Sequence, residues 1–219
     1  MTLIVTSDYA LNKVAAPNLP LAPVEYDKQY IDRLNNVLRL YFNRLDNILG
    51  QLSTATDTSG LRVPYGAFSS DQDQSTTANT ATLMTLNTTD FSNGVSIASS
   101  KITVATAGIY NLQFSAQFQN TDNAIQDISI WLKQNGTDIT GSTGFVSIPA
   151  RKSASAGEEA HEIIGWNYYV SMTAGQYIEI YWSTTLASVT IQNYAASTGP
   201  VRPSTQSVVA TMTFVSALP

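Results

Sequence analysis

One stretch of the sequence alternates between apolar and polar side chains more regularly than any other. It runs from Thr106 to Phe118, and polar residues separate its regularly spaced apolar ones, which are Tyr110, Leu112, Phe114, Ala116 and Phe118. Successive side chains of a β-strand point to opposite faces, so the pattern predicts a strand with one buried and one solvated face, begun by a turn at Ala107-Gly108. Such a strand needs antiparallel partners that share its apolar face.

Shorter segments of the same character surround this strand. They are residues 63–69, 82–87, 102–104, 128–132, 145–148, 164–172, 178–182, 189–191 and 208–214. Turn signals separate them at roughly ten-residue spacing, and Asn135-Gly136 is a dipeptide that favours a tight hairpin. No helical pattern lies among them. Residues 63–219 are therefore predicted to form a mainly β domain, an antiparallel jelly-roll sandwich.

Composition narrows the functions open to the chain. Only 12% of its 219 residues are charged and the net charge is −5, so no basic cluster is present to neutralise nucleic-acid phosphates. The chain has no cysteine, which excludes disulfides and thiolate zinc sites. No apolar run approaches the roughly 20 residues of a membrane span, and Met1–Val5 is too short for a secretion signal. We expect no nucleic-acid partner, no membrane span and no secretion by the usual signal.

Residues 1–23 contain Pro17, Pro20 and Pro23. Proline fixes φ and pushes the preceding residue to extended geometry, so this segment is predicted to be an extended N-terminal arm. A solvated linker would lack its apolar side chains. We expect the arm to lie on a neighbouring protein, and a self-packed tail or a disordered terminus is the alternative.

Residues 24–52 show helical periodicity, with apolar side chains at steps of three and four residues. One stripe comprises Tyr30, Leu34, Val37, Tyr41, Leu45, Ile48 and Leu52, and a second comprises Ile31, Leu38, Phe42 and Leu49. This wide apolar face predicts one long amphipathic helix for anchoring or oligomerisation. A helix packed on its own β domain is the alternative. The polar residues 53–62 are predicted to be a linker.

The arm and the helix carry a run of distinctive short motifs. They are Leu19-Pro20-Leu21-Ala22-Pro23, Tyr26-Asp27, Tyr30, Leu34, Leu38, Leu40-Tyr41-Phe42 and Leu45-Asp46-Asn47. This segment resembles the leading segment of virion proteins in tailed phages, notably marine and cyanobacterial ones. The resemblance implies anchoring to a capsid or tail through Leu19, Leu21, Tyr26, Tyr30, Leu34, Leu38, Tyr41, Phe42 and Leu45.

A second series of motifs runs through the β domain. In order they are Ala67-Phe68-Ser69-Ser70, Asn93-Gly94, residues 107–115, Leu132-Lys133-Gln134-Asn135-Gly136, residues 174–180 and Met212-Thr213-Phe214-Val215. Their order is similar to that in the trimeric jelly roll of the complement globular head and tumour necrosis factor, with a helix in place of the collagen-like stalk. The resemblance implies a homotrimer about an aromatic and apolar axis. Tyr169, Tyr177 and Tyr181 lie opposite the predicted core positions of their strands, and we expect them to pack between subunits. Isolated surface tyrosines are the alternative.

The sequence offers little for catalysis. His161 is the single histidine and lies in residues 158–162, which are predicted to be a solvated acidic loop. Asp71-Gln72-Asp73 supplies too few oxygen ligands for a calcium site. A glycan hydrolase needs two facing carboxylates, for which Glu162 and Glu179 on neighbouring strands are the pair to consider. We predict a protein that is not an enzyme, with no catalytic residue, no metal site and no cofactor.

These observations together predict a non-enzymatic phage virion protein, located in the virion and assembled in the host cytoplasm. It would be a homotrimeric capsid or tail appendage, for decoration or fibre attachment, that contacts other virion proteins through residues 1–52. The alternative is a receptor-binding tip that recognises a host surface glycan or protein through exposed loops such as Asn193-Tyr194. A virion-bound glycan hydrolase is a third hypothesis.

Overall fold

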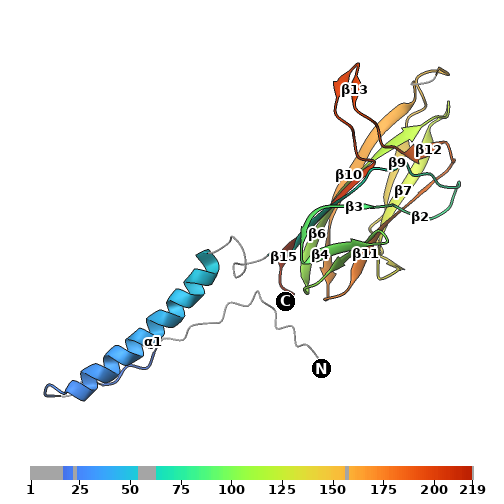
Figure 1. The fold of residues 1–219 in the computed structure, drawn as a ribbon. Helices are drawn as coiled ribbons and strands as arrows, with labels where there is room; N and C mark the ends of the chain where they lie inside the picture. Colours follow the sequence, from blue (N-terminus) through green and yellow to red (C-terminus); the bar gives the residue numbers. More distant parts are fainter. Residues whose placement is uncertain (1–16, 22–23, 54–62, 156–157, 219) are drawn as a thin grey trace. The chain divides into compact units, whose positions relative to one another are not determined.

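The chain forms two separate units, residues 1–62 and residues 63–219. The computed structural model describes residues 17–21, 24–53, 63–155 and 158–218 (Figure 1). Most of the predicted arm (1–23) and nearly all of the predicted linker (53–62) lie outside the described residues, so both stay predictions.

The helix of the first unit is α1 (Lys28–Ser53), which begins later than the predicted Val24. Asp27 explains the difference, because its side-chain Oδ1 accepts a hydrogen bond from the backbone N–H of Gln29 at 2.8 Å. A side chain that accepts from the first turn in this way is an N-cap and marks the residue before the helix. Residues 24–25 consequently form a bend outside the helix.

Antiparallel strands arrange the second unit into two main sheets (Figure 1). The first, which we call the β6 sheet, has the order β10 (Ala160–Met172), β6 (Gly108–Asn120), β15 (Val208–Ser216), β1 (Tyr65–Ser70) and β3 (Thr88–Asn93), with β12 (Val189–Ile191) beside β6. The second, the β11 sheet, has the order β4 (Val95–Ala98), β5 (Lys101–Val104), β11 (Tyr177–Thr184), β7 (Gln126–Gln134) and β8 (Thr137–Asp138), with β2 (Thr82–Leu83) beside β11 and β9 (Gly144–Ile148) beside β7. Two short strands, β13 (Ser197–Thr198) and β14 (Val201–Arg202), form a hairpin of their own.

The chain passes from one sheet to the other at most of its long connections. It runs from β5 to β6 to β7, and again from β9 to β10 to β11 to β12, changing sheet at each of these steps. Two antiparallel sheets connected in this way form a jelly roll, so the predicted fold class is confirmed.

The core lies between the two sheets, where the apolar side chains of the strands meet. Along β6 every even-numbered residue is buried, which confirms the periodicity from which the fold was predicted. Phe118 of β6 and Trp182 of β11 meet in an edge contact across the core, with ring centroids 5.6 Å apart. Aromatic side chains buried in this way contribute more apolar area than any other residue and hold the two sheets together.

The turn at Asn135-Gly136 connects β7 to β8 as predicted. Both residues have positive φ, 51° and 80°, which is the geometry of the tightest hairpin turns. Several short strands were not predicted, namely β3, β4, β8, β13 and β14. Most are too short to show a period, and β3 exposes almost all of its side chains, so no alternation marks it.

Candidate functional site

The outward side chains of β10, β6, β15 and β1 form one continuous surface, which we call the β6 face. Ser115 lies at its centre, in register with Gly165 of β10 and Val209 of β15. The outward positions are Ile163, Gly165, Asn167, Tyr169 and Ser171, then Ile109, Asn111, Gln113, Ser115 and Gln117, then Val209, Thr211, Thr213 and Val215, and finally Tyr65, Ala67 and Ser69. None of these positions carries Asp, Glu, Lys or Arg. An uncharged surface that exposes Ile163 by 71% and Tyr169 by 57% is typical of a contact between proteins.

The outward side chains of β5, β11 and β7 form a second surface, the β11 face, which carries many charges. Glu179 is only 5% exposed and stands in register with Lys133 of β7. The Nζ atom of Lys133 lies 4.4 Å from the ring centroid of Tyr181, and that of Lys101 lies 4.4 Å from the centroid of Tyr177. Lysines of the same chain therefore cover the tyrosines of this face.

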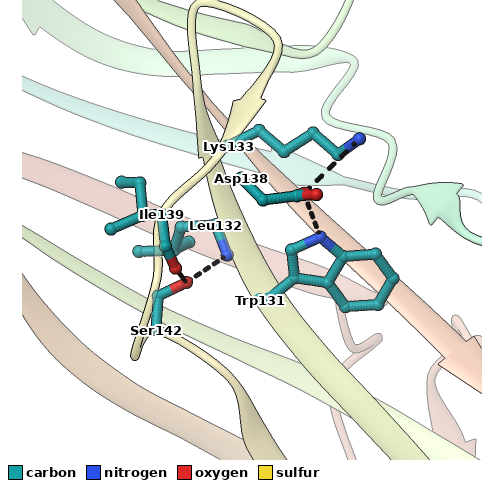
Figure 2. A network of polar contacts seen from close by, with 6 residues as sticks. All are labelled: Trp131, Leu132, Lys133, Asp138, Ile139 and Ser142. Atoms are coloured by element: carbon teal, nitrogen blue, oxygen red, sulfur yellow. Dashed lines mark hydrogen bonds and ion pairs between the residues drawn. The ribbon is translucent and has the colours of Figure 1, made fainter.

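The β7–β8 hairpin at the edge of the β11 face holds a network of polar contacts (Figure 2). The indole Nε1–H of Trp131 donates to Oδ1 of Asp138 at 2.7 Å, and Nζ of Lys133 lies 3.5 Å from the same oxygen. The backbone N–H of Leu132 donates to Oγ of Ser142 at 3.0 Å, and that hydroxyl donates onward to a main-chain carbonyl at 2.8 Å. The polar groups of this hairpin thus find partners within the chain.

The three tyrosines predicted to pack between subunits lie on two different surfaces. Tyr169 lies on the β6 face, whereas Tyr177 and Tyr181 lie on the β11 face. Tyr169 is exposed, and the other two are half-buried beside their lysines. The structure therefore does not bring the three together within one subunit, and the trimer interface stays a prediction.

A pocket of about 370 Å³ lies at one end of the β6 face. The strands β6 and β10 supply Gln117, Phe118, His161, Glu162 and Ile163, and the segment that follows β12 supplies Tyr194, Arg202 and Thr205. The β13–β14 hairpin belongs to that segment and stands out at this end of the sandwich (Figure 1). The volume and the mixture of apolar and polar lining are typical of a small-molecule site.

Hydrogen bonds hold residues 192–207 against the sheet. The backbone N–H of Asn193 donates to Oδ1 of Asp73 at 2.8 Å, and its side-chain amide donates to the carbonyl of Thr205 at 2.9 Å. The side-chain amide of Gln117 donates to the main chain of the same segment at 2.8 Å. The wall of the pocket is thereby fixed from both sides.

Tyr194 lies at the centre of the polar contacts in the pocket. Its hydroxyl lies 3.0 Å from Nδ1 of His161, and the guanidinium carbon of Arg202 lies 5.4 Å from its ring centroid. Burial and then the negative charges of Glu159 and Asp73 raise the pKa of Tyr194 to about 12, against an opposing effect of Arg202. The phenol is therefore neutral over the physiological range, in a field in which negative charge predominates.

The placement of His161 corrects a prediction. Its segment was expected to be a solvated loop, but β10 begins at Ala160, which pairs with Asn120 at the end of β6. Pairing with the long β6 strand extends β10 beyond the part that alternates in sequence, because ladder hydrogen bonds do not depend on the side-chain pattern. His161 is consequently a strand residue with a fixed partner in Tyr194.

Glu162 and Glu179 do not form the facing pair that a glycoside hydrolase needs. Their strands, β10 and β11, belong to different sheets, so the expectation that they are neighbours was wrong. Glu162 lines the pocket and Glu179 lies on the β11 face. Among the residues that the structure describes, no group of three or more His, Cys, Asp and Glu side chains could hold a metal ion. The carboxylate of Asp71 instead accepts a hydrogen bond from the side chain of Asn87 at 2.6 Å.

The predicted anchoring residues lie in the first unit, and none of them is buried. Leu19, Leu21, Tyr26 and Phe42 are exposed, and Tyr30, Leu34, Leu38, Tyr41 and Leu45 are partly covered. Their role stays a prediction. In the part of the chain that the structure describes, no helix combines the length and apolar character that crossing a membrane requires.

Sequence reasoning singled out Tyr194 as a loop residue for recognition, and it considered His161 and Glu162 separately, but it did not bring them together in one pocket. The other lining residues come from distant segments that meet only because β10 pairs with β6. One local signal was present, since Gly199-Pro200 is a strong turn dipeptide that could have indicated the β13–β14 hairpin and hence placed Arg202 beside Tyr194.

No protein-family model and no curated protein sequence matches this chain. Its function is therefore inferred from its own residues.

Proposed function

We propose that the chain is a non-enzymatic structural protein of a tailed-phage virion, a homotrimeric capsid or tail appendage anchored through its N-terminal arm and α1. The observation that carries this proposal is the uncharged β6 face. An outer sheet face that meets water normally carries charged side chains, as the β11 face does. A face of small and amide side chains that exposes Tyr169 and Ile163 fits burial against another subunit.

The first unit supports an anchoring role. The apolar side chains of α1 that the structure describes, up to Leu45, are exposed or only partly covered, and a helix with a wide apolar face gains most of its stability from packing on a partner. The resemblance of residues 19–47 to the leading segment of phage virion proteins favours a capsid or tail protein as that partner. A trimer would present three such anchors, and multivalency would make attachment far tighter than one anchor allows.

The solution mass of two proteins, measured by light scattering on a sizing column, tests the assembly. They are the full chain and residues 63–219, a segment that contains every buried apolar side chain among the described residues and so is expected to fold alone. Trimers of both would support assembly through the β6 face. A trimer of the full chain only would assign assembly to α1 and overturn the role of the β6 face, and monomers of both would overturn the homotrimer.

The virion assignment has its own test. Particles of the phage that encodes the chain are purified on a density gradient and probed with an antibody against residues 63–219. Co-migration of the chain with infectious particles is expected, and its absence from them would overturn the assignment.

A receptor-binding tip is the second candidate function, and the pocket is the observation that favours it. The chain enters the sandwich at Val63, where the N–H of Phe214 donates to the carbonyl of Pro64. Phe214 pairs with Tyr110 at the beginning of β6, whereas the pocket is lined by Phe118 near its end. Eight residues of strand separate these points by roughly 26 Å. A site at the end away from the tether is well placed to meet an external partner.

A further inference from the structure

The β13–β14 hairpin projects from the end of the sandwich and carries no contact at its tip within the described part of the chain (Figure 1). Gly199-Pro200 connects its two strands, and the residue after them, Val201, is 88% exposed. Residues 195–201 include no charged side chain. Burial of such a tip against another protein removes apolar surface from water without desolvating a charge.

The base of the hairpin is fixed on the outer side of the β6 sheet. The hydroxyl of Tyr194 lies 3.0 Å from Nδ1 of His161, and the side-chain amide of Gln117 donates to the main chain of the same segment at 2.8 Å. Gln117 is an outward position of β6, and His161 lies two residues before the outward Ile163 of β10, so both side chains point to the outer side. Arg202 closes the base by donating from Nη1 to a main-chain carbonyl at 2.7 Å. The hairpin therefore rises from the same side of the sheet as the β6 face.

The pocket of about 370 Å³ lies beside the hairpin on that side. Its outward lining comprises Gln117, His161 and Ile163 of the sheet with Tyr194, Arg202 and Thr205 of the segment after β12. Ile163 is 71% exposed and supplies an apolar wall. Arg202 uses only Nη1 of its guanidinium in hydrogen bonds to the described residues, so its remaining N–H groups are donors for a partner.

We propose that the hairpin tip of one subunit fills the pocket of the next subunit, an inference that rests on the homotrimer of the proposed function. When the β6 face is the subunit contact, a hairpin that rises from its end meets the neighbour, and the neighbour covers a pocket in the same face. The chain enters each sandwich at Val63, and three anchors gathered at that end set the trimer axis along the strands. Rotation about this axis keeps the height of every element. The hairpin and the pocket share one end of the sandwich, so they meet at the same level.

The chemistry of the tip fits the pocket. Pro200 and Val201 are aliphatic and match Ile163 of the partner subunit. The main-chain carbonyls at the turn are acceptors for the guanidinium of the partner subunit's Arg202. Each subunit gives one tip and receives one, so the contact is heterologous, and a three-fold ring closes it.

Cysteine cross-linking tests the contact, because the chain has no cysteine of its own. Two full-length chains are co-expressed, one with Val201→Cys and the other with Ile163→Cys, and the oxidised sample is run on a denaturing gel without reductant. Each chain carries one cysteine, so any disulfide joins two subunits. We expect covalent dimers, since a disulfide forms where the Cα atoms lie within about 7 Å.

Three controls accompany this pair. Val201→Cys alone and Ile163→Cys alone should give no covalent dimer, because in a heterologous contact neither position meets its own copy. Val201→Cys co-expressed with Ile125→Cys should give none either, since Ile125 is similarly exposed (66%) but does not line the pocket.

A charge at the tip provides a second measurement. Val201→Lys places an ammonium group against Arg202 of the partner subunit, and light scattering over a dilution series should show dissociation of the trimer at about tenfold or more higher concentration. Ile125→Lys makes the same change at the other exposed position and should leave the dissociation unchanged. Neither side chain belongs to the buried core, so both variants should fold.

The outcomes separate this contact from the homotrimer on which it rests. Trimers that give no covalent dimer in the co-expressed pair, or that dissociate at the same concentration in Val201→Lys, would overturn the hairpin contact and leave the homotrimer standing. Monomers of the unaltered full chain would overturn the homotrimer and this contact with it. Trimers without the cross-link would also leave the pocket open, as the receptor-binding candidate requires.

Discussion

The β6 face and the β11 face are built from the same kind of antiparallel strand and enclose the same core, yet their outward residues differ in kind. At the centre of the β6 face, Ser115 lies between Gly165 and Val209. At the centre of the β11 face, Glu179 is in register with Lys133. The side chains at the centre of the β6 face are uncharged and small. Those of the β11 face include charged groups that contact neighbouring side chains of the same face.

The difference indicates which of the two faces can be buried against another subunit without the free-energy cost of desolvating charged groups. Covering the β11 face would remove Lys101 and Lys133 from water, and desolvating charges costs more than their mutual attraction returns unless the geometry is excellent. Covering β10, β6 and β15 on the β6 face would remove only hydroxyl, amide and apolar groups, and a carboxylate comes in only beyond β1, where Asp90 of β3 accepts a hydrogen bond from Oγ of Ser69 at 3.0 Å. For the proposed homotrimer we therefore assign the subunit contact to the β6 face and the solvent to the β11 face.

The most direct test of this assignment is to place a charged side chain at the centre of each face. Ser115→Arg should dissociate the trimer, because a buried guanidinium without a partner costs about 2–5 kcal/mol at each subunit contact. Ser183→Arg makes the same change on the β11 face, where the residue is equally half-exposed, and should leave the trimer intact. Light scattering at matched concentrations checks both. A trimer that survives Ser115→Arg and is lost in Ser183→Arg would reverse the assignment of the two faces.

Tyrosine substitutions compare the two faces again, with a smaller expected effect on the trimer. Tyr169→Ser should weaken each contact by about 1–2 kcal/mol, which is the usual cost of removing an aromatic side chain from an interface. Tyr181→Ser should leave the trimer constant unchanged and lower the stability of the sandwich by about 1 kcal/mol, since the side chain packs beside Trp131 and under Lys133.

Dilution experiments on the trimer and urea unfolding at one protein concentration measure the two quantities separately. A weakened trimer in Tyr181→Ser, with Tyr169→Ser unaffected, would place the contact on the β11 face.

The fold was largely predictable because its periodic strands are long. The alternation in residues 106–118 predicted β6 and its buried face, and Asn135-Gly136 predicted the hairpin after β7. The short strands were missed because two to six residues with mostly exposed side chains carry no period. The start of α1 was placed too early because Asp27 is equally plausible in a first helical turn and as its cap.

The pocket was harder to predict because it depends on contacts between distant segments. Tyr194 was singled out as a loop residue, but its partner His161 was assigned to a solvated loop among acidic neighbours. Only the pairing of Ala160 with Asn120 brings His161 into β10 and beside the segment after β12. Alternation within a strand reveals its own faces, whereas it does not reveal which loop will fold over its end.

The end of the β6 face offers the last and smallest test, because several charged groups gather there around Tyr194. The pKa of Tyr194 is raised from 10.0 to about 12 by burial and by Glu159 and Asp73. The raised pKa means that the fold favours the neutral phenol, so its contribution to stability is complete below pH 10 and is lost as the pH rises towards 12. Stability at neutral pH should therefore not depend on this ionisation.

Tyrosinate absorbance after a rapid pH jump, recorded before unfolding, measures the ionisation in the folded protein. The full chain should show a late component, and in Tyr194→Phe its amplitude should fall by one tyrosine. Asp73→Asn keeps an oxygen for the N–H of Asn193 and removes one negative charge, so it should move the late component to lower pH. A late component that keeps its full amplitude in Tyr194→Phe would show that burial, Glu159 and Asp73 do not hold Tyr194 in its neutral form, and that the field at this end of the β6 face is not the one that the geometry implies.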